Sequence, residues 1–272
     1  MPKRFQRKIL KNGMTILFEK RDIPVVSVAI AIKHGGIHEK ENEKGISHFI
    51  EHMLYKGTPT RDSKQIATEI EKNGGELNGF TSEEVTAYWC KMPSIHANIA
   101  LDVLTDMVKN PLFDENEIEK ERKVIFEEMK MRKDSPRIFI FDEIQSHLYK
   151  NPFGKNLIGT KETLKEIERK DLVKKFSEIY TPNNMIICVV GNYSMEKIVK
   201  WTEENFTKKG KKIHQIKIEK KNTSKIEKRK GIDQANIVLA FHLPLAKDKK
   251  NYAAQLLMTL MGEGLSSRLF IK

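Results

Sequence analysis

Hydrophobic residues alternate with polar ones in several short segments of the chain and follow helical spacing in longer ones. The alternation over residues 76–92 predicts a strand or a hairpin, and Gly74-Gly75 ends the helical pattern before it. Further strands are expected at residues 14–19, 25–33 and 185–191, and helices at 63–73, 96–109, 114–133 and over most of 137–180. This mixture predicts an α+β fold, a layered lobe of helices packed on one face of a mainly antiparallel sheet.

A second strand-then-helix pattern follows a strongly basic stretch near the end of the chain. The pattern predicts a strand over residues 236–242 and a helix over 252–261 that ends at Gly262. A lone strand and helix cannot bury both of their faces, so we expect this piece to pack against the first lobe or to expose apolar surface. The expected division is a lobe at 1–207, a basic linker at 208–230 and the start of a second lobe at 231–272.

The most informative local pattern is the pentapeptide His48-Phe49-Ile50-Glu51-His52, which lies in a predicted amphipathic helix. Histidines four residues apart project from one helix face, so both imidazoles can reach one metal ion. Glu51 lies on the same side and can approach a metal-bound water without being a ligand. Two nitrogen ligands, an open coordination position and a carboxylate base are what a zinc hydrolase needs, and this residue order marks the inverzincins. The alternative is a helix with two exposed histidines.

A third ligand is offered by the predicted helix at 114–133, which opens on Asp114-Glu115-Asn116-Glu117, a sequence with the form of a capping box. Glu121 and Glu128 are seven residues apart and therefore share one helix face, whereas Glu127 points away from Glu121. In the functional interpretation Glu128 is the ligand and Glu121 orients a histidine ring. The alternative is a solvated acidic face, and helix geometry alone does not decide between them.

The chain resembles the family of pitrilysin, insulin-degrading enzyme and mitochondrial processing peptidase, and most of all its small bacterial and archaeal members. The matching segments are 45–58 around the histidine motif, 121–128, Asn78-Gly79-Phe80-Thr81, 180–185 and 189–192. The resemblance implies a zinc metallopeptidase with His48, His52 and Glu128 as ligands of one Zn²⁺ per chain. It also implies that Asn78, Gly79 and Phe80 belong to an edge strand that holds peptide. From residue type alone, Gly79 could equally mark a bulge or a turn.

Members of this family have two similar lobes, the second without metal ligands, so the pattern that begins at residue 231 is similar to the start of such a lobe. It stops at Lys272, before the Arg and Tyr that contact the substrate carbonyl in the family. We therefore expect a truncated second lobe and weak activity from this chain alone, with a second lobe or a partner subunit completing the site.

The expected reaction is hydrolysis of an unfolded or short peptide that docks as an added β-strand. Zinc polarises the scissile carbonyl and acidifies the bound water, while Glu51 takes the proton and delivers it to the leaving amine. The alternative from another class is a non-catalytic peptide-binding or assembly subunit of a processing-peptidase-like complex. Such subunits usually lose motif residues, whereas this chain keeps all four, which favours the metalloendopeptidase.

Composition changes this interpretation little. The net charge of +12 is concentrated between Lys208 and Lys230, a stretch that contains eleven Lys or Arg residues and only two acidic residues. No aromatic residue interleaves with them, so a solvated linker is expected and nucleic acid is not an expected partner. The sequence contains no membrane-spanning apolar run and no apolar signal core, so we expect no membrane partner and a cytoplasmic location. Cys90 and Cys188 lack a paired spacing and are expected to be reduced core residues.

Overall fold

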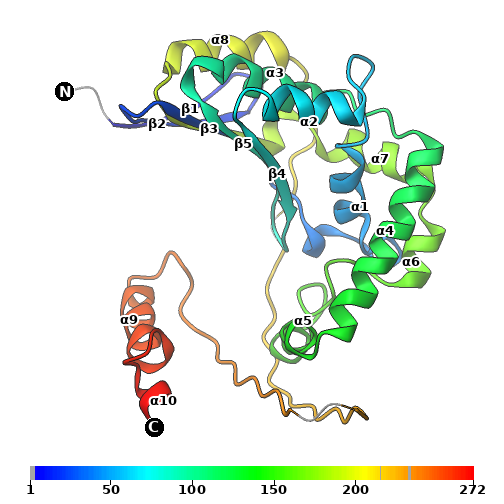
Figure 1. The fold of residues 1–272 in the computed structure, drawn as a ribbon, viewed down its shortest axis with the longest axis vertical. Helices are drawn as coiled ribbons and strands as arrows, with labels where there is room; N and C mark the ends of the chain where they lie inside the picture. Colours follow the sequence, from blue (N-terminus) through cyan, green and yellow to red (C-terminus); the bar gives the residue numbers. More distant parts are fainter. Residues whose placement is uncertain (1–3, 215, 232–233) are drawn as a thin grey trace.

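The computed structural model describes residues 4–214, 216–231 and 234–272 and contains one mixed α/β lobe followed by a separate pair of helices (Figure 1). The strands within these residues are β1 Phe5–Ile9, β2 Thr15–Lys20, β3 Val25–Ile32, β4 Glu76–Thr81, β5 Thr86–Pro93 and β6 Met185–Gly191. The helices of the lobe are α1 Ile46–Met53, α2 Ser63–Glu71, α3 Ala97–Lys109, α4 Glu115–Asp134, α5 Pro136–Leu148, α6 Lys161–Glu166, α7 Arg169–Ile179 and α8 Met195–Asn205. The separate pair is α9 Lys250–Gly262 and α10 Arg268–Ile271, and short 3₁₀ turns occupy Gly36–His38, Glu41–Glu43, Ser94–His96 and Pro182–Asn184.

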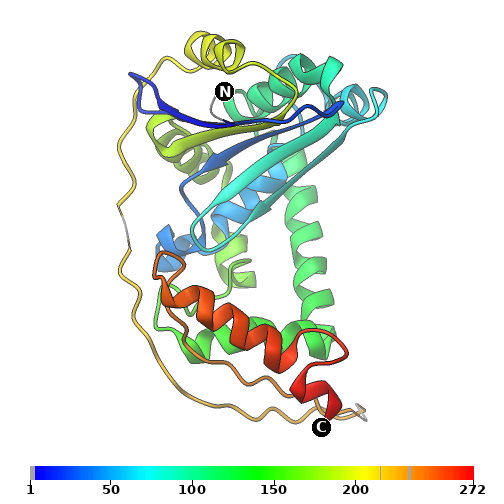
Figure 2. The same cartoon turned by 90° about the vertical axis from the view of Figure 1, so that its left-hand side faces the viewer.

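The strands form one sheet in the order β1-β2-β6-β3-β5-β4, with β2 and β6 parallel and every other neighbouring pair antiparallel. Alternate residues of β3 (Val26, Val28, Ile30 and Ile32) are buried, and α3 packs against β3 and β5. Helix α1 packs against β4 and β5. The α+β lobe with helices on one face of a mainly antiparallel sheet is therefore confirmed, and it places β4 at a sheet edge beside α1 (Figures 1 and 2).

The expected strands and helices of the lobe are all present, and the structure adds β1, which the hydrophobic pattern did not predict. Strand β1 is an edge strand, and its apolar residues Phe5 and Ile9 remain exposed. A strand with no buried face leaves no alternation in the sequence, which is why it was missed. Cys90 is buried and Cys188 half-buried, and both are free thiols as expected.

The strand expected at 236–242 is wrong for this structure. The backbone there is extended, but within the described residues no other strand pairs with it, and a strand without a ladder partner leaves its peptide groups unsatisfied. Its alternating apolar side chains are exposed, Ile237 by 80%, Leu239 by 80% and Phe241 by 77%. The helix expected next is present as α9, which stands apart from the lobe in Figure 1 and has no buried residue. Of the two outcomes expected, this piece therefore exposes its apolar surface.

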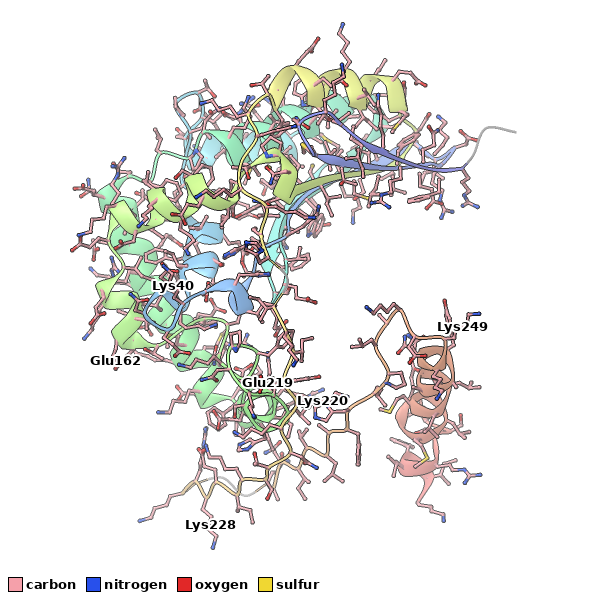
Figure 3. The ribbon with its side chains drawn as sticks, turned by 180° about the vertical axis from the view of Figure 1, so that it is seen from behind. Lys40, Glu162, Glu219, Lys220, Lys228 and Lys249 are labelled. Atoms are coloured by element: carbon pink, nitrogen blue, oxygen red, sulfur yellow. The ribbon has the colours of Figure 1, made fainter. Side chains whose placement is uncertain are left out.

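The basic segment carries no helix in its described residues, 208–214 and 216–230, and its middle contacts α5. A single bridge joins Tyr149 to Lys220, and the Lys150 amide donates to the Glu219 carbonyl at 2.9 Å. Figure 3 shows Glu219 and Lys220 close to α5, while the exposed Lys228 points outward. The described part of this segment is thus an extended strap held by a few backbone and side-chain hydrogen bonds. No helix of the described residues combines the length and the apolar content that crossing a membrane requires.

Candidate metal centre

Helix α1 carries the histidine motif and begins abruptly at Gly45, whose φ of 94° lies in the left-handed region that glycine tolerates. A side chain there would also overlap the Ile158 carbonyl. The buried Glu39 carboxylate accepts the Gly45 amide at 3.0 Å and the Ser47 amide at 2.8 Å, so it satisfies the exposed N–H groups of the first turn. This cap fixes the turn in which His48 lies.

The two histidines and Glu128 converge on one point. The distance from His48 Nε2 to Glu128 Oε2 is 3.6 Å, and from His52 Nε2 to the same oxygen 3.8 Å. The three side chains offer ligand atoms that all lie within 4.8 Å of one another, and among the described residues no other group of three or more His, Cys, Asp or Glu side chains does so. Glu128 comes from α4, which packs against α1.

Glu121 lies two helical turns before Glu128 on the same face of α4. It contacts the Nδ1 side of the His52 ring, opposite the Nε2 atom that approaches Glu128. Its Oε2 is 3.0 Å from His52 Nδ1, and its Oε1 is 2.6 Å from Lys56 Nζ. Burial alone would raise the pKa of Glu121, but the hydrogen bonds from His52 and Lys56 hold it below its ordinary value. A carboxylate on Nδ1 leaves the Nε2 lone pair of His52 free to bind a metal.

Helix α4, which carries both carboxylates, begins at the cap that the sequence predicted. Asp114 accepts the amides of Asn116 and Glu117, and α4 ends at Asp134, directly before the Pro136 that starts α5. The expected return bond of a capping box is replaced by an ion pair between Glu117 and Lys120. Glu127 points outward and pairs with Lys130, so only the other two glutamates face α1.

This donor set fits a zinc ion. Burial, together with the nearby charges of His52 and Arg132, lowers the pKa of His48 to about 3, so its imidazole is neutral at pH 7 and can donate a lone pair. A tetrahedral ion with bonds of about 2.0–2.2 Å spaces its ligand atoms roughly 3.3–3.6 Å apart. The His48–Glu128 separation of 3.6 Å meets that spacing, the His52–Glu128 separation of 3.8 Å is slightly longer, and all three ligand atoms lie within 4.8 Å of one another.

Glu51 lies beside this group without belonging to it. Burial raises the pKa of Glu51, and a hydrogen bond from the Thr81 hydroxyl to Glu51 Oε2, 2.5 Å long, offsets part of that rise. An open cavity of about 300 Å³ adjoins it and is lined by residues of α1, β4, α4, α5 and the loop at 156–158. On its far wall Arg132 binds Asp142 through two hydrogen bonds of 3.0 and 2.6 Å. The cavity thus brings the Glu51 carboxylate, the His48 imidazole and the Glu128 carboxylate to one opening.

The predicted peptide-binding residues lie on β4, whose outer edge pairs with no other strand in the described part of the chain. Asn78 and Phe80 are exposed on one face, and Phe80 (49% exposed) lines the cavity. Gly79 pairs with Tyr88 in a regular register, so it is neither a bulge nor a turn. Its amide donates to the Asn78 side-chain oxygen at 2.8 Å.

Gly79 is needed because the space beside it is already filled. A Cβ at this position would lie 2.5 Å from the Tyr55 hydroxyl and 2.9 Å from the Ala87 carbonyl. We expect Gly79→Ala to destabilise the lobe by about 1–3 kcal/mol through this overlap. Tyr55→Phe should recover part of the loss, because the buried Tyr55 hydroxyl has no hydrogen-bond partner within the described residues. Urea unfolding of the two single variants and the double variant measures this, and additive effects would contradict the contact.

Three residues at the centre were not assigned a role from the sequence: Thr81, Lys56 and Glu39. Thr81 was part of a matched segment, and its spacing of two from Gly79 puts both on the strand face that meets α1. Lys56 follows His52 by four residues, which is the helical spacing of side-chain neighbours. No local sequence pattern indicated Glu39, because its carboxylate caps α1 from a loop that precedes the helix.

Comparisons with known proteins agree with this geometry. A family model described as Insulinase (Peptidase family M16) matches residues 15–161, and one described as Peptidase M16 inactive domain matches residues 166–272. The uncharacterized zinc protease YmxG of Bacillus subtilis (strain 168) is 36% identical over 270 residues, which cover 97% of this chain and 66% of that protein. The mitochondrial-processing peptidase subunit beta of Dictyostelium discoideum is 33% identical over 199 residues, covering 72% of this chain and 42% of its own length.

Among solved structures, a protease from Helicobacter pylori superposes with a TM-score of 0.84 at 25% identity, covering 100% of this chain and 68% of that one. The peptidase M16 inactive domain from Pseudomonas fluorescens shares the fold, with a TM-score of 0.78 at 17% identity. The chain spans about two thirds of the length of its bacterial relatives.

Proposed function

We propose that this chain, which belongs to the insulinase family of peptidases (peptidase family M16), carries the zinc site of a metalloendopeptidase. In this proposal His48, His52 and Glu128 bind one Zn²⁺ and Glu51 is the general base. The observation that carries it is the approach of both imidazole Nε2 atoms to one Glu128 oxygen, with a second, unliganded carboxylate at the same opening.

Zinc bound here supplies a Lewis acid that polarises the scissile carbonyl and acidifies a water. Glu51 takes a proton from the attacking water as the carbon–oxygen bond forms, and then delivers it to the nitrogen as the peptide C–N bond breaks. Glu121 holds His52 in the tautomer that presents Nε2, and Lys56 keeps Glu121 ionised. The chain therefore provides ligands, base and ligand orientation from two helices.

The proposed substrate is an unfolded or short peptide that extends the sheet along β4. Asn78, Gly79 and Phe80 lie on that strand beside the cavity, and a free strand edge binds peptide through main-chain hydrogen bonds. Such binding requires an extended backbone, so folded proteins are poor substrates.

We also propose that residues 1–207 form the zinc lobe, 208–230 the linker and 231–272 the start of a second lobe. In support, β6 belongs to the same sheet as β1–β5 and α8 packs against β2 of that sheet, whereas α9 makes its main contacts with α10. The apolar face of α9 and the alternating residues before it would be covered by a further lobe or a partner subunit.

The test is cleavage of an unstructured, internally quenched peptide by the chain loaded with one equivalent of zinc. We expect turnover that a chelator removes and added zinc restores, and no cleavage of a stably folded protein. If the zinc-loaded chain does not cleave the peptide, a second lobe from a bacterial relative is added in trans. Silence even then, in protein that holds zinc, would contradict the peptidase and favour a non-catalytic subunit.

A further inference from the structure

The strand that offers its edge to peptide also contacts the general base. Alternate residues of β4 face opposite sides of the sheet, and Leu77, Gly79 and Thr81 share the side that meets α1. From this side the Thr81 hydroxyl donates to Glu51 Oε2 at 2.5 Å. Within the described residues, Thr81 is the one side chain that hydrogen-bonds Glu51.

Thr81 is itself held firmly by the turn that follows it. The Ser82 amide donates to the Val85 carbonyl at 2.8 Å, which closes the hairpin between β4 and β5. The carbonyls of Ser82 and Glu83 accept the amides of Gly36 and Ile37 at 3.1 Å and 2.9 Å. This fixes the hairpin tip against the loop that leads into α1.

The close approach of that loop depends on Gly35, because a Cβ there would overlap the Ser82 carbonyl. The hairpin and the start of α1 are thus joined through backbone, which leaves Thr81 little freedom relative to Glu51. Its branched Cβ restricts rotation further, so the hydroxyl is presented in one orientation.

A glutamate without such a partner rotates about three side-chain bonds and spends much of its time away from the water it must deprotonate. A short hydrogen bond from a hydroxyl to a carboxylate is about twice as strong as one between neutral groups. It therefore selects one position of the carboxylate before substrate arrives.

We infer that Thr81 is a positioning residue for the general base: its hydroxyl fixes the Glu51 carboxylate toward the metal centre. Because Thr81 belongs to β4, the strand that aligns the peptide also places the base relative to it. This role rests on the proposed function of Glu51.

The test compares Thr81→Val, which keeps the shape and loses the hydroxyl, with Thr81→Ser, which keeps the hydroxyl. Thr81→Val should lower kcat about 10- to 100-fold, the cost of a base displaced by about 1 Å, with KM within about twofold and zinc content unchanged. Thr81→Ser should restore most of kcat. In the Glu51→Gln background Thr81→Val should have no further effect, because there is no base left to position.

Thr86→Val is the matched control for loss of a threonine hydroxyl from the same hairpin. Thr86 pairs with Thr81 across the two strands, but its buried hydroxyl donates to the His34 carbonyl at 3.0 Å and not to Glu51. This variant should lower the melting temperature and leave kcat of the folded protein unchanged. A purely structural Thr81 would behave in the same way.

The outcomes separate the two proposals. Turnover that depends on Glu51 but is equal in wild type and Thr81→Val would overturn the role of Thr81 alone. A fall in kcat that Thr81→Ser fails to rescue would overturn it as well. Absence of any turnover that depends on Glu51, even with the second lobe added in trans, would overturn the proposed function, and the role of Thr81 with it.

Discussion

Replacement of Glu51 by Gln should abolish peptide hydrolysis while leaving zinc bound. Glutamine has the shape of glutamate and can still accept the Thr81 hydroxyl, so the local structure of α1 should be kept. It cannot accept a proton, so the attacking water loses its base. Removal of general acid–base catalysis costs about 10²–10⁴ in rate, and because Glu51 serves both steps we expect the upper end.

The measurement is turnover of the quenched peptide alongside zinc content, which separates chemistry from metal loss. Glu127→Gln is the matched control, since it removes the same charge from an exposed position on α4. The account is contradicted if Glu51→Gln retains more than about one tenth of wild-type kcat, because even a modest general base contributes more than that.

Replacement of Glu128 by Gln should weaken zinc binding more than about 100-fold. Loss of an outer partner of a zinc ligand costs about 10- to 100-fold in affinity, and loss of a ligand itself should exceed this. Glu121→Gln should fall in the 10- to 100-fold range, since its carboxylate touches His52 Nδ1 and faces no ligand position. Glu127→Gln, next to Glu128 in sequence but on the outer side of α4, should bind zinc like the wild type.

Competition with a chromogenic chelator at fixed pH gives these affinities. The expected order of affinity is wild type and Glu127→Gln first, then Glu121→Gln, then Glu128→Gln. Equal affinities for the Glu127 and Glu128 variants would contradict the assignment of the third ligand.

The elements of the lobe could be predicted from the sequence because each contains a local pattern, such as an apolar run or a helix cap, that marks it. Strand β6 was located over the residues it occupies, since its apolar run is short for a helix and rich in β-branched Ile and Val. Helix α4 was recognised from its helical spacing and from Asp114 at its start. The family suggested by the local motifs is confirmed by the comparisons.

Elements that depend on distant partners could not be predicted. The alternation at 236–242 is a genuine strand pattern, but a strand forms only where a neighbour supplies its ladder, and the described residues supply none. Strand β1 shows the reverse case, because its pairing with β2 comes from backbone bonds and leaves no apolar alternation.

At the candidate metal centre, too, local spacing predicted some residues, whereas others depend on how distant elements pack. Spacing placed His48, Glu51 and His52 on one face of α1, and spacing alone offered both Glu121 and Glu128. Only the packing of α4 on α1 puts Glu128 near both Nε2 atoms and Glu121 behind His52. Thr81 reaches Glu51 from a strand 30 residues away in sequence, which no local pattern reveals.

The most direct test of the central claim is an anomalous difference map recorded at the zinc absorption edge from crystals grown with one equivalent of zinc. The account predicts one strong peak within about 2.0–2.3 Å of His48 Nε2, His52 Nε2 and a Glu128 oxygen. A peak at the stacked His34 and His38 rings, or no peak between α1 and α4, would contradict it.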